Sequence, residues 1–149
     1  MHIETASIED IPELCDLLAI LFSQEAEFIA NRFIQETGLR HIITDANVGI
    51  VLVARHNDKI IGMVNLLFTI STALGAKVAI LEDMVVLPTE RGLGVGSHLL
   101  NAAITTAREN SCKRITLLTD SDNEAAQEFY KKQGFQASTM LPFRLSLDS

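Results

Sequence analysis

The chain has 149 residues, of which 48% are apolar and 21% are charged, and its formal net charge is −7. This length and apolar content predict one domain with a sizeable hydrophobic core. The acidic balance argues against nucleic acids and anionic membranes as partners, because both are bound through surplus Lys and Arg. A cationic partner such as an amine would be weakly attracted to such a surface.

The first part of the chain predicts a strand and two helices. A strand is expected over residues 2–6, and Ser7 with Asp10 three residues later resembles a capping box that opens a helix. A second helix is expected over residues 27–43, with Gly38 as a candidate break. Apolar residues in the first helix repeat at helical spacing, at Ile8, Ile11, Leu14, Leu18 and Leu21.

Two cysteines, Cys15 and Cys112, lie far apart and outside any CxxC pattern. We expect two buried, reduced thiols and no disulfide framework, which is typical of a reducing compartment such as the cytoplasm. The acidic residues Glu4, Glu9 and Asp10 near the start are not typical of a signal peptide, which favours the same location.

The middle of the chain predicts three strands. Residues 48–55 and 59–70 form the two arms of an expected hairpin around an Asn-Asp-Lys turn. Residues 60–76 are an uncharged stretch of 17 residues, but their glycines and polar residues favour a strand and a turn over a membrane span. A further strand over residues 78–86 is ended by Pro88.

The last third of the chain alternates helices and strands. A helix is expected to end at Asn110 in the left-handed conformation, and a strand follows over residues 114–119. A capping box over residues 121–124 opens another helix, which Gly134 ends, and a last strand is expected over residues 143–147. The order β-α-α-β-β-β-α-β-α-β predicts an α/β domain with a mixed sheet.

The sharpest local signal is the segment Arg91-Gly92-Leu93-Gly94-Val95-Gly96-Ser97, which follows a strand and opens a helix. Glycines let a backbone turn with positive φ and approach a ligand, and a helix N-terminus offers unpaired N–H groups to an anion. Arg91 adds a positive charge. The segment is neither a GxGxxG fingerprint nor a P-loop, so the alternative is a tight turn that needs glycine only for geometry.

Two motifs follow one another along the chain. Arg91-x-x-Gly94-x-Gly96 comes after a strand that ends in Val85-Val86-Leu87-Pro88, and residues 123–135 have the pattern N-x-x-A-x-x-x-Y-x-x-x-G-F. Together they resemble the pyrophosphate loop and a downstream helix of the GNAT superfamily of N-acetyltransferases. The resemblance implies one GNAT-type domain over residues 1–149, with a mixed, partly split sheet flanked by helices.

The resemblance also implies acetyl-CoA as the acyl donor. Its pantetheine arm would lie between the strand that ends at Val86 and the strand that ends at Thr119. Main-chain groups of residues 84–86 would bond this arm, and amides of residues 92–97 would hold the pyrophosphate. The implied cofactor-binding residues are Met84, Val85, Val86, Arg91, Gly92, Leu93, Gly94, Val95, Gly96, Ser97, Asn123 and Tyr130.

In the family, a tyrosine at the place of Tyr130 protonates the leaving thiolate of CoA. Tyr130 is the only tyrosine of the chain, and it lies seven residues after Asn123. This spacing places both residues on one face of a helix, where a single ligand could touch them. The alternative is an amphipathic tyrosine that covers the core with its hydroxyl in water.

Two acidic residues, Glu82 and Asp83, interrupt an otherwise apolar strand, where charge is costly unless it is used or paired. Since an amine must lose a proton before it attacks a thioester, we predict Glu82 as the base or a water relay. Asp83 is predicted to orient the substrate or to be structural. This run also resembles glucosamine-phosphate N-acetyltransferases of the superfamily, and the alternative for both residues is ion pairing or hydrogen bonding at the strand end.

We therefore expect an N-acetyltransferase that moves acetyl from acetyl-CoA to a primary amine of a small molecule or peptide by direct attack. The alternatives are an acyl-CoA-sensing domain without turnover and a nucleotide-phosphate site unrelated to CoA. Dimers are common in the family, so a homodimer is a further expectation. No metal is expected, because the four histidines, His2, His41, His56 and His98, show no ligand spacing.

Overall fold

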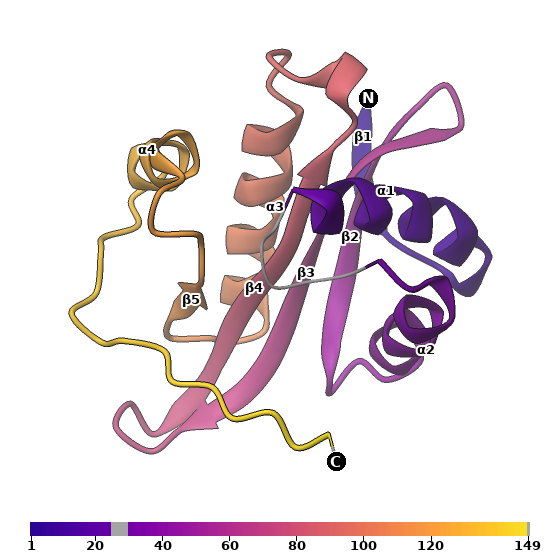
Figure 1. Ribbon diagram of the computed structural model, residues 1–149. Coiled ribbons are helices and arrows are strands. Elements are labelled where there is room, and N and C mark those ends of the chain that lie inside the picture. The colour runs from indigo at the N-terminus through magenta and orange to yellow at the C-terminus, as the bar shows by residue number, and fades with distance from the viewer. Residues whose placement is uncertain (25–29, 149) are drawn as a thin grey trace. The chain divides into compact units, whose positions relative to one another are not determined.

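The structure is a computed structural model that describes residues 1–24 and 30–148. Its chain divides into two compact units, residues 1–118 and residues 119–149. The N-terminal unit holds all the strands and helices α1 to α3, and the C-terminal unit holds helix α4 (Figure 1).

The N-terminal unit is built on a five-stranded mixed sheet in the order β1-β2-β3-β4-β5, as the α/β prediction requires. Neighbouring strands are antiparallel except β4 and β5, which are parallel and joined through α3. The strands are β1 (His2–Thr5), β2 (Gly49–His56), β3 (Lys59–Ser71), β4 (Ala76–Val86) and β5 (Ile115–Leu117). The helices of this unit are α1 (Ile11–Ser23), α2 (Arg32–Ile43) and α3 (Val95–Glu109).

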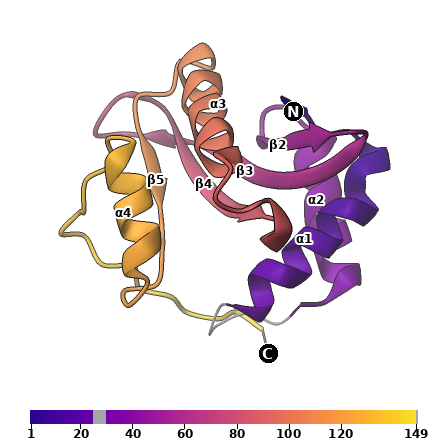
Figure 2. The same cartoon turned by 90° about the horizontal axis from the view of Figure 1, so that it is seen from above.

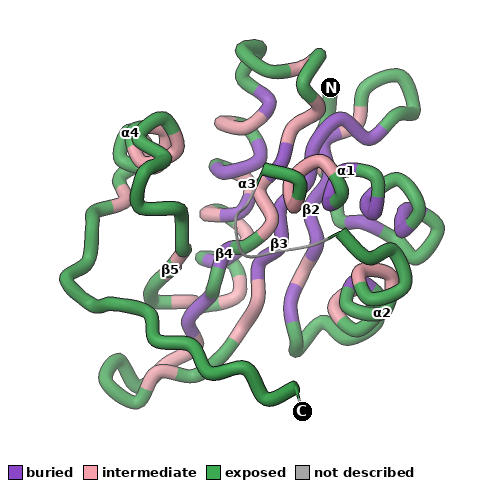
Figure 3. Tube along the Cα trace, viewed as in Figure 1, coloured by how far each residue is buried: buried purple, intermediate pink, exposed green. Residues whose placement is uncertain are grey.

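Helices α1 and α2 cover one face of the sheet and α3 covers the other (Figure 2). On the first face, Met63 and Val85 join a buried cluster with Leu14 and Leu17 of α1. On the second face, a Cβ added to Gly62 would lie only 2.9 Å from Leu99 of α3, so this glycine allows a close approach. Figure 3 shows the buried residues along the strands and the inner sides of these helices.

The predicted capping box at Ser7 and Asp10 is confirmed. The main-chain N–H of Ser7 donates to the Asp10 carboxylate at 2.8 Å, and a 3-10 turn (Ile8–Asp10) leads into α1. The second helix begins later than expected, at Arg32, because Asn31 caps it by accepting from the N–H of Ile34. Residues 27–29 of that prediction lie outside the described residues, and Gly38 does not break the helix.

The predicted hairpin is confirmed as β2 and β3. Its two turn residues, Asn57 and Asp58, have φ values of 52° and 63°, which short polar side chains tolerate better than most. The long uncharged stretch is β3 and a turn, as expected from its polar residues. Within the described residues, no helix is long and apolar enough to cross a membrane.

The end of α3 differs from the prediction by one residue. Asn110 keeps a negative φ of −91° while its side-chain amide donates to the carbonyl of Thr106 at 2.8 Å. Ser111 adopts the left-handed conformation instead, with a φ of 62°. The following strand, β5, is also shorter than the expected range of residues 114–119.

In the C-terminal unit, helix α4 (Glu124–Lys132) begins at a different cap from the one predicted. Asn123 is the N-cap, because its side-chain oxygen accepts from the N–H of Ala126 at 3.0 Å. The expected box opening at Ser121 is therefore wrong by two residues. The predicted end at Gly134 is confirmed: its φ is 102°, and its N–H donates to the carbonyl of Lys131.

The prediction of a strand over residues 143–147 is wrong. No ladder among the described residues includes this segment, so β5 is the last strand of the chain that the structure describes. Phe143, Leu145 and Leu147 alternate as a strand requires, yet their side chains are exposed. Alternating apolar residues do not by themselves form a strand, because the main-chain N–H and C=O groups of a strand also need a neighbouring strand to bond.

Candidate functional site

Strand β4 loses one of its two neighbours part-way along its length. The ladder with β5 pairs residues 79–81 with residues 115–117, and beyond Leu81 the described residues pair β4 with β3 alone. The sheet is therefore partly split, and residues 82–86 form an open backbone edge without a second strand partner among the described residues. Val85 packs its side chain into the core, so only its main chain is available at this edge.

A β-bulge lies where the split begins. Met63 of β3 pairs with Val85, whereas Asn65 pairs with Glu82, so β4 carries one extra residue in this interval. Within it, Asp83 has a φ of 56°, which lies in the left-handed region. Such bulges bend a strand and change the direction of its side chains, and they are common beside active sites.

The bulge brings the amide of Asn65 to the carboxylate of Asp83, and Glu82 is the next residue along the strand. The side-chain nitrogen of Asn65 donates to Oδ2 of Asp83 at 2.7 Å, and Glu82 lies opposite Asn65 in the ladder. Asn65 is only 2% exposed, Asp83 is half-buried and Glu82 is exposed. Asn65 was missed in the sequence, although it is the one polar residue between Ile60 and Phe68.

The glycine-rich segment forms a tight turn after a short 3-10 turn (Pro88–Glu90). Gly92 and Gly94 have φ values of 79° and 84°, so both use the left-handed freedom that glycine provides. Gly94 is the N-cap of α3 and supplies no capping side chain. The N–H groups of the first turn of α3, which includes Gly96 and Ser97, are thus left for another acceptor.

Two side chains fix this turn in place. Nε of Arg91 donates to the main-chain oxygen of Val86 at 3.1 Å, which ties the turn to the end of β4. Nδ1 of His98 lies 2.7 Å from the carbonyl oxygen of Gly94. Leu93 is exposed and Val95 is buried at the start of α3. The bond between Arg91 and Val86 therefore holds the glycine turn next to the open edge of β4.

The other predicted site residues, Asn123 and Tyr130, lie in the C-terminal unit. Asn123 uses its side-chain oxygen to cap α4. The ring of Tyr130 makes edge-to-face contacts with Phe129, at 5.1 Å between centroids, and with Phe135, at 5.8 Å. These contacts hold the half-buried tyrosine in one orientation on its helix.

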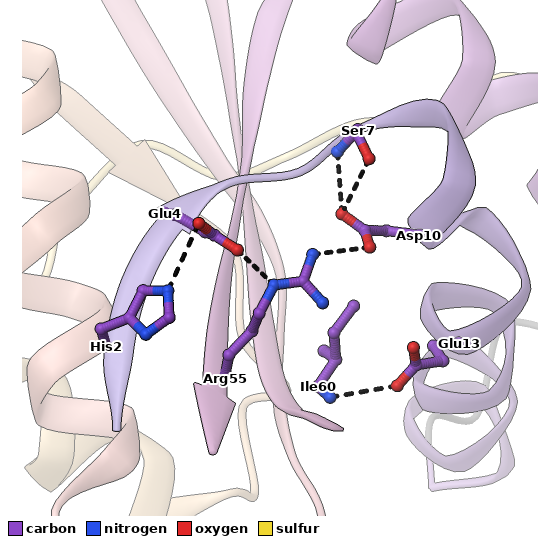
Figure 4. Close-up of polar contacts among 7 residues, drawn as sticks. All are labelled: His2, Glu4, Ser7, Asp10, Glu13, Arg55 and Ile60. Atoms are coloured by element: carbon purple, nitrogen blue, oxygen red, sulfur yellow. Dashed lines mark hydrogen bonds and ion pairs between the residues drawn. The ribbon is translucent and has the colours of Figure 1, made fainter. Parts of the chain in front are cut away.

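A second polar cluster joins β1, β2 and the start of α1 (Figure 4). Arg55 binds both Glu4 and Asp10, with a distance of 2.6 Å between Nη2 and the Asp10 oxygen. Hydrogen bonds from Arg55, and to a lesser extent from His2, hold the pKa of Glu4 below its ordinary value. Burial raises the pKa of Asp10, but hydrogen bonds from Arg55 and Ser7 outweigh it and leave this pKa lowered. The cluster connects secondary-structure elements, which is a structural role.

Both cysteines are free thiols. Cys15 is buried, as expected, but Cys112 is only half-buried, so the prediction that both are buried is wrong for Cys112. Burial raises the pKa of both thiols, which favours their protonated form. In the part of the chain that the structure describes, no group of three or more His, Cys, Asp or Glu side chains could hold a metal ion.

Residues 11–135 match the family model described as the acetyltransferase (GNAT) family. The chain belongs to the GNAT family. The match covers both the glycine turn and helix α4, so the two motifs that suggested the family lie within it. GNAT enzymes are acyl-CoA-dependent N-acyltransferases that typically use acetyl-CoA.

Individual relatives agree with this GNAT assignment. An aminoalkylphosphonate N-acetyltransferase from Salmonella typhimurium is 29% identical over 133 residues, which cover 89% of this chain and 83% of that protein. An uncharacterised N-acetyltransferase from Bacillus subtilis is 34% identical over 90 residues, and the match spans only 60% of each chain. The solved structure of a putative acetyltransferase from Agrobacterium tumefaciens is 26% identical, with a TM-score of 0.82 over 97% of this chain and 100% of that one.

Proposed function

We propose that this protein transfers an acetyl group from acetyl-CoA to a primary amine of a small molecule or peptide by direct attack. The observation that carries the proposal is the connection of the glycine turn to the open edge of β4 through Arg91 and Val86. This connection offers main-chain donors for a diphosphate beside the unpaired edge of residues 82–86, whose Val86 oxygen already accepts from Arg91, and that edge suits an extended amide-containing arm.

Two features of the glycine turn support a diphosphate site, one in its geometry and one in its energy. A Cβ added to Gly92 would meet nothing within 4 Å, and one added to Gly94 would come no closer than 3.7 Å to His98, so no described atom crowds the turn at these positions. Each hydrogen bond to a charged group contributes about 1.5–3 kcal/mol. Several amides of residues 92–97 would thus supply most of the roughly 8 kcal/mol of a micromolar complex.

The chemical roles follow from the kinds of side chain present. The exposed carboxylate of Glu82 would take a proton from the arriving amine, directly or through water, and Asp83 would orient that amine. Tyr130 would give a proton to the departing CoA sulfur, and Asn123 would contact the cofactor arm. Because the family match runs from residue 11 to residue 135, we also propose that both units form one acetyltransferase domain.

The acceptor is best sought among small amines and peptides. The Salmonella relative acts, by its name, on aminoalkylphosphonates, so aminomethylphosphonate is the first compound to test. Spermidine, kanamycin and a peptide with a free N-terminus complete a panel of different sizes and charges. A soluble amine is consistent with the net charge of −7, which weakly attracts cations.

The test is thiol release from acetyl-CoA in the presence of each amine. Turnover with at least one amine, abolished when that amine is omitted, supports the proposal. A protein that binds CoA in calorimetry but turns over none of these amines would instead be an acyl-CoA-binding domain. Thermal stabilisation by ATP or NAD without stabilisation by CoA would point to a nucleotide site and reject the proposal.

A further inference from the structure

Asn65 is a buried polar residue that bonds the half-buried Asp83, and the proposed chemistry gives Asn65 itself no role. Asn65 lies in the middle of β3, with buried apolar neighbours on both sides along the strand, and is 2% exposed. Its Nδ2 donates to Oδ2 of Asp83 at 2.7 Å. Because Asn65 is neutral, this bond orients the Asp83 carboxyl group without adding a charge of its own.

Two unfavourable features meet at this point. The side-chain oxygen of Asn65 is buried and has no hydrogen-bond partner among the described residues. Asp83 occupies the left-handed region at a φ of 56°, which aspartate tolerates better than most residues but less freely than glycine. A leucine at position 65 has the same branched shape, although it is larger, and would remove the unpaired oxygen, so the apolar surroundings alone do not favour asparagine. Local costs of this kind gather at functional sites.

We propose that Asn65 is a positioning residue for the acceptor amine, an inference that rests on the proposed function. Its amide holds the Asp83 carboxylate in one orientation at the bulge, beside the exposed Glu82 and the open edge of β4. The oriented carboxylate accepts an N–H of the protonated amine before that amine loses its proton. The bulge thereby selects acceptors that carry an ammonium group with at least one N–H.

The first experiment measures binding of a minimal ammonium ion. Methylammonium chloride is titrated into 15N-labelled protein saturated with CoA, and the amide signals of residues 82–84 are followed. We expect these signals to shift, and the apparent dissociation constant to rise roughly fivefold or more in Asn65→Leu. Tetramethylammonium, which has the charge but no N–H, should not distinguish the two proteins.

A matched control is Asn101→Leu, which makes the same substitution at an exposed position of α3. It should bind methylammonium as the wild type does. Equal methylammonium affinity in wild type and Asn65→Leu would overturn the proposal. So would wild-type signals at the bulge that do not respond to methylammonium.

A second experiment exchanges the partners in the double variant Asn65→Asp with Asp83→Asn. The hydrogen bond can re-form with donor and acceptor reversed, which moves the carboxylate from β4 to β3. We expect the double variant to recover the melting temperature lost in Asn65→Asp. Its KM for the amine should stay about tenfold or more above wild type, while its KM for acetyl-CoA stays within about twofold.

These outcomes separate the role of Asn65 from the proposed function. Recovery of both stability and amine KM in the double variant would make the pair purely structural and overturn the inference. Turnover in Asn65→Leu with an unchanged amine KM would overturn the inference alone. Absence of turnover in the wild type would reject the proposed catalysis, and methylammonium binding would then decide the role of Asn65.

Discussion

Three residues of the candidate site hold backbone conformations that most residues avoid. Gly92 and Gly94 have φ values of 79° and 84°, and Asp83 has a φ of 56°. The left-handed region costs most residues with a Cβ roughly 1–2 kcal/mol, aspartate somewhat less, whereas glycine adopts it freely. The glycines therefore permit the turn, and Asp83 offsets part of its cost through the hydrogen bond from Asn65.

Replacing Gly94 with valine should weaken CoA binding. The β-branched side chain disfavours the φ of 84° and moves the N–H groups at the start of α3. We expect the dissociation constant for CoA, measured by calorimetry, to rise about tenfold or more. Gly38→Ala in α2, where a Cβ meets nothing within 4 Å, is the control: it should stabilise the fold by about 0.5–1 kcal/mol and leave CoA affinity unchanged. Unchanged affinity in Gly94→Val would remove the turn from the site.

Replacing Tyr130 with phenylalanine should slow turnover without weakening cofactor binding. The ring contacts with Phe129 and Phe135 are kept, so only the hydroxyl proton donor is lost. We expect kcat to fall about 10²–10⁴-fold in the thiol-release assay, as is typical when a general acid is removed. Equal rates for the two proteins would exclude Tyr130 as the acid and leave it as part of the ring cluster.

At the scale of secondary-structure elements, the Arg55 cluster fixes the first strand and helix to the sheet. Arg55 in β2 reaches Glu4 in β1 and Asp10 at the start of α1 (Figure 4). Glu13 of α1 also accepts from the main-chain N–H of Ile60 in β3 at 3.0 Å. None of these residues belongs to the glycine turn or bonds it within the described ranges, so a variant here tests stability without removing a residue proposed to hold the cofactor.

Stability should fall as acid protonates this cluster. The pKa values of Glu4 and Asp10 are lowered in the folded protein, so the unfolded chain binds more protons in this range. The stability that Glu4 and Asp10 contribute is fully present above the ordinary carboxyl pKa of about 4. It is lost as the pH falls through the lower pKa values that these residues have in the folded protein. Arg55→Met should lower the melting temperature at pH 7 by about 3 °C or more and flatten its decline between about pH 5 and pH 3. An unchanged slope would show that Arg55 does not hold these carboxylates.

Elements set by adjacent residues could be predicted from the sequence. Ser7 with Asp10, the Asn57–Asp58 turn and Gly134 each act within a few residues, and the structure confirms all three. The caps at Asn123 and Ser111 were missed because neighbouring residues compete for the same role. Asn123, and not Ser121, caps α4, because its side-chain oxygen accepts from the N–H of Ala126.

Features that depend on pairing between distant segments could not be predicted in the same way. The bulge at Asp83 arises from the register between β3 and β4, and neither strand encodes that register by itself. The contact between Asn65 and Asp83 depends on the same register. The alternating segment 143–147 shows the converse case, since a strand pattern is present without a partner strand in the described structure.

At the scale of the whole molecule, the proposed activity draws on both units. Glu82, Asp83 and the glycine turn belong to residues 1–118, whereas Asn123 and Tyr130 belong to the C-terminal unit. The family match runs through both. One cofactor that contacts both motifs would make the two units respond together to a single ligand.

The most direct test is a titration of 15N-labelled protein with CoA, compared with pantetheine, which lacks the diphosphate. We predict that CoA shifts the main-chain amide signals of residues 92–97 and, at the same ligand concentrations, those of residues 123–130. Pantetheine should leave the signals of residues 92–97 in place, because it offers these amides no anion. Saturating CoA that left the signals of residues 92–97 unmoved would contradict the account.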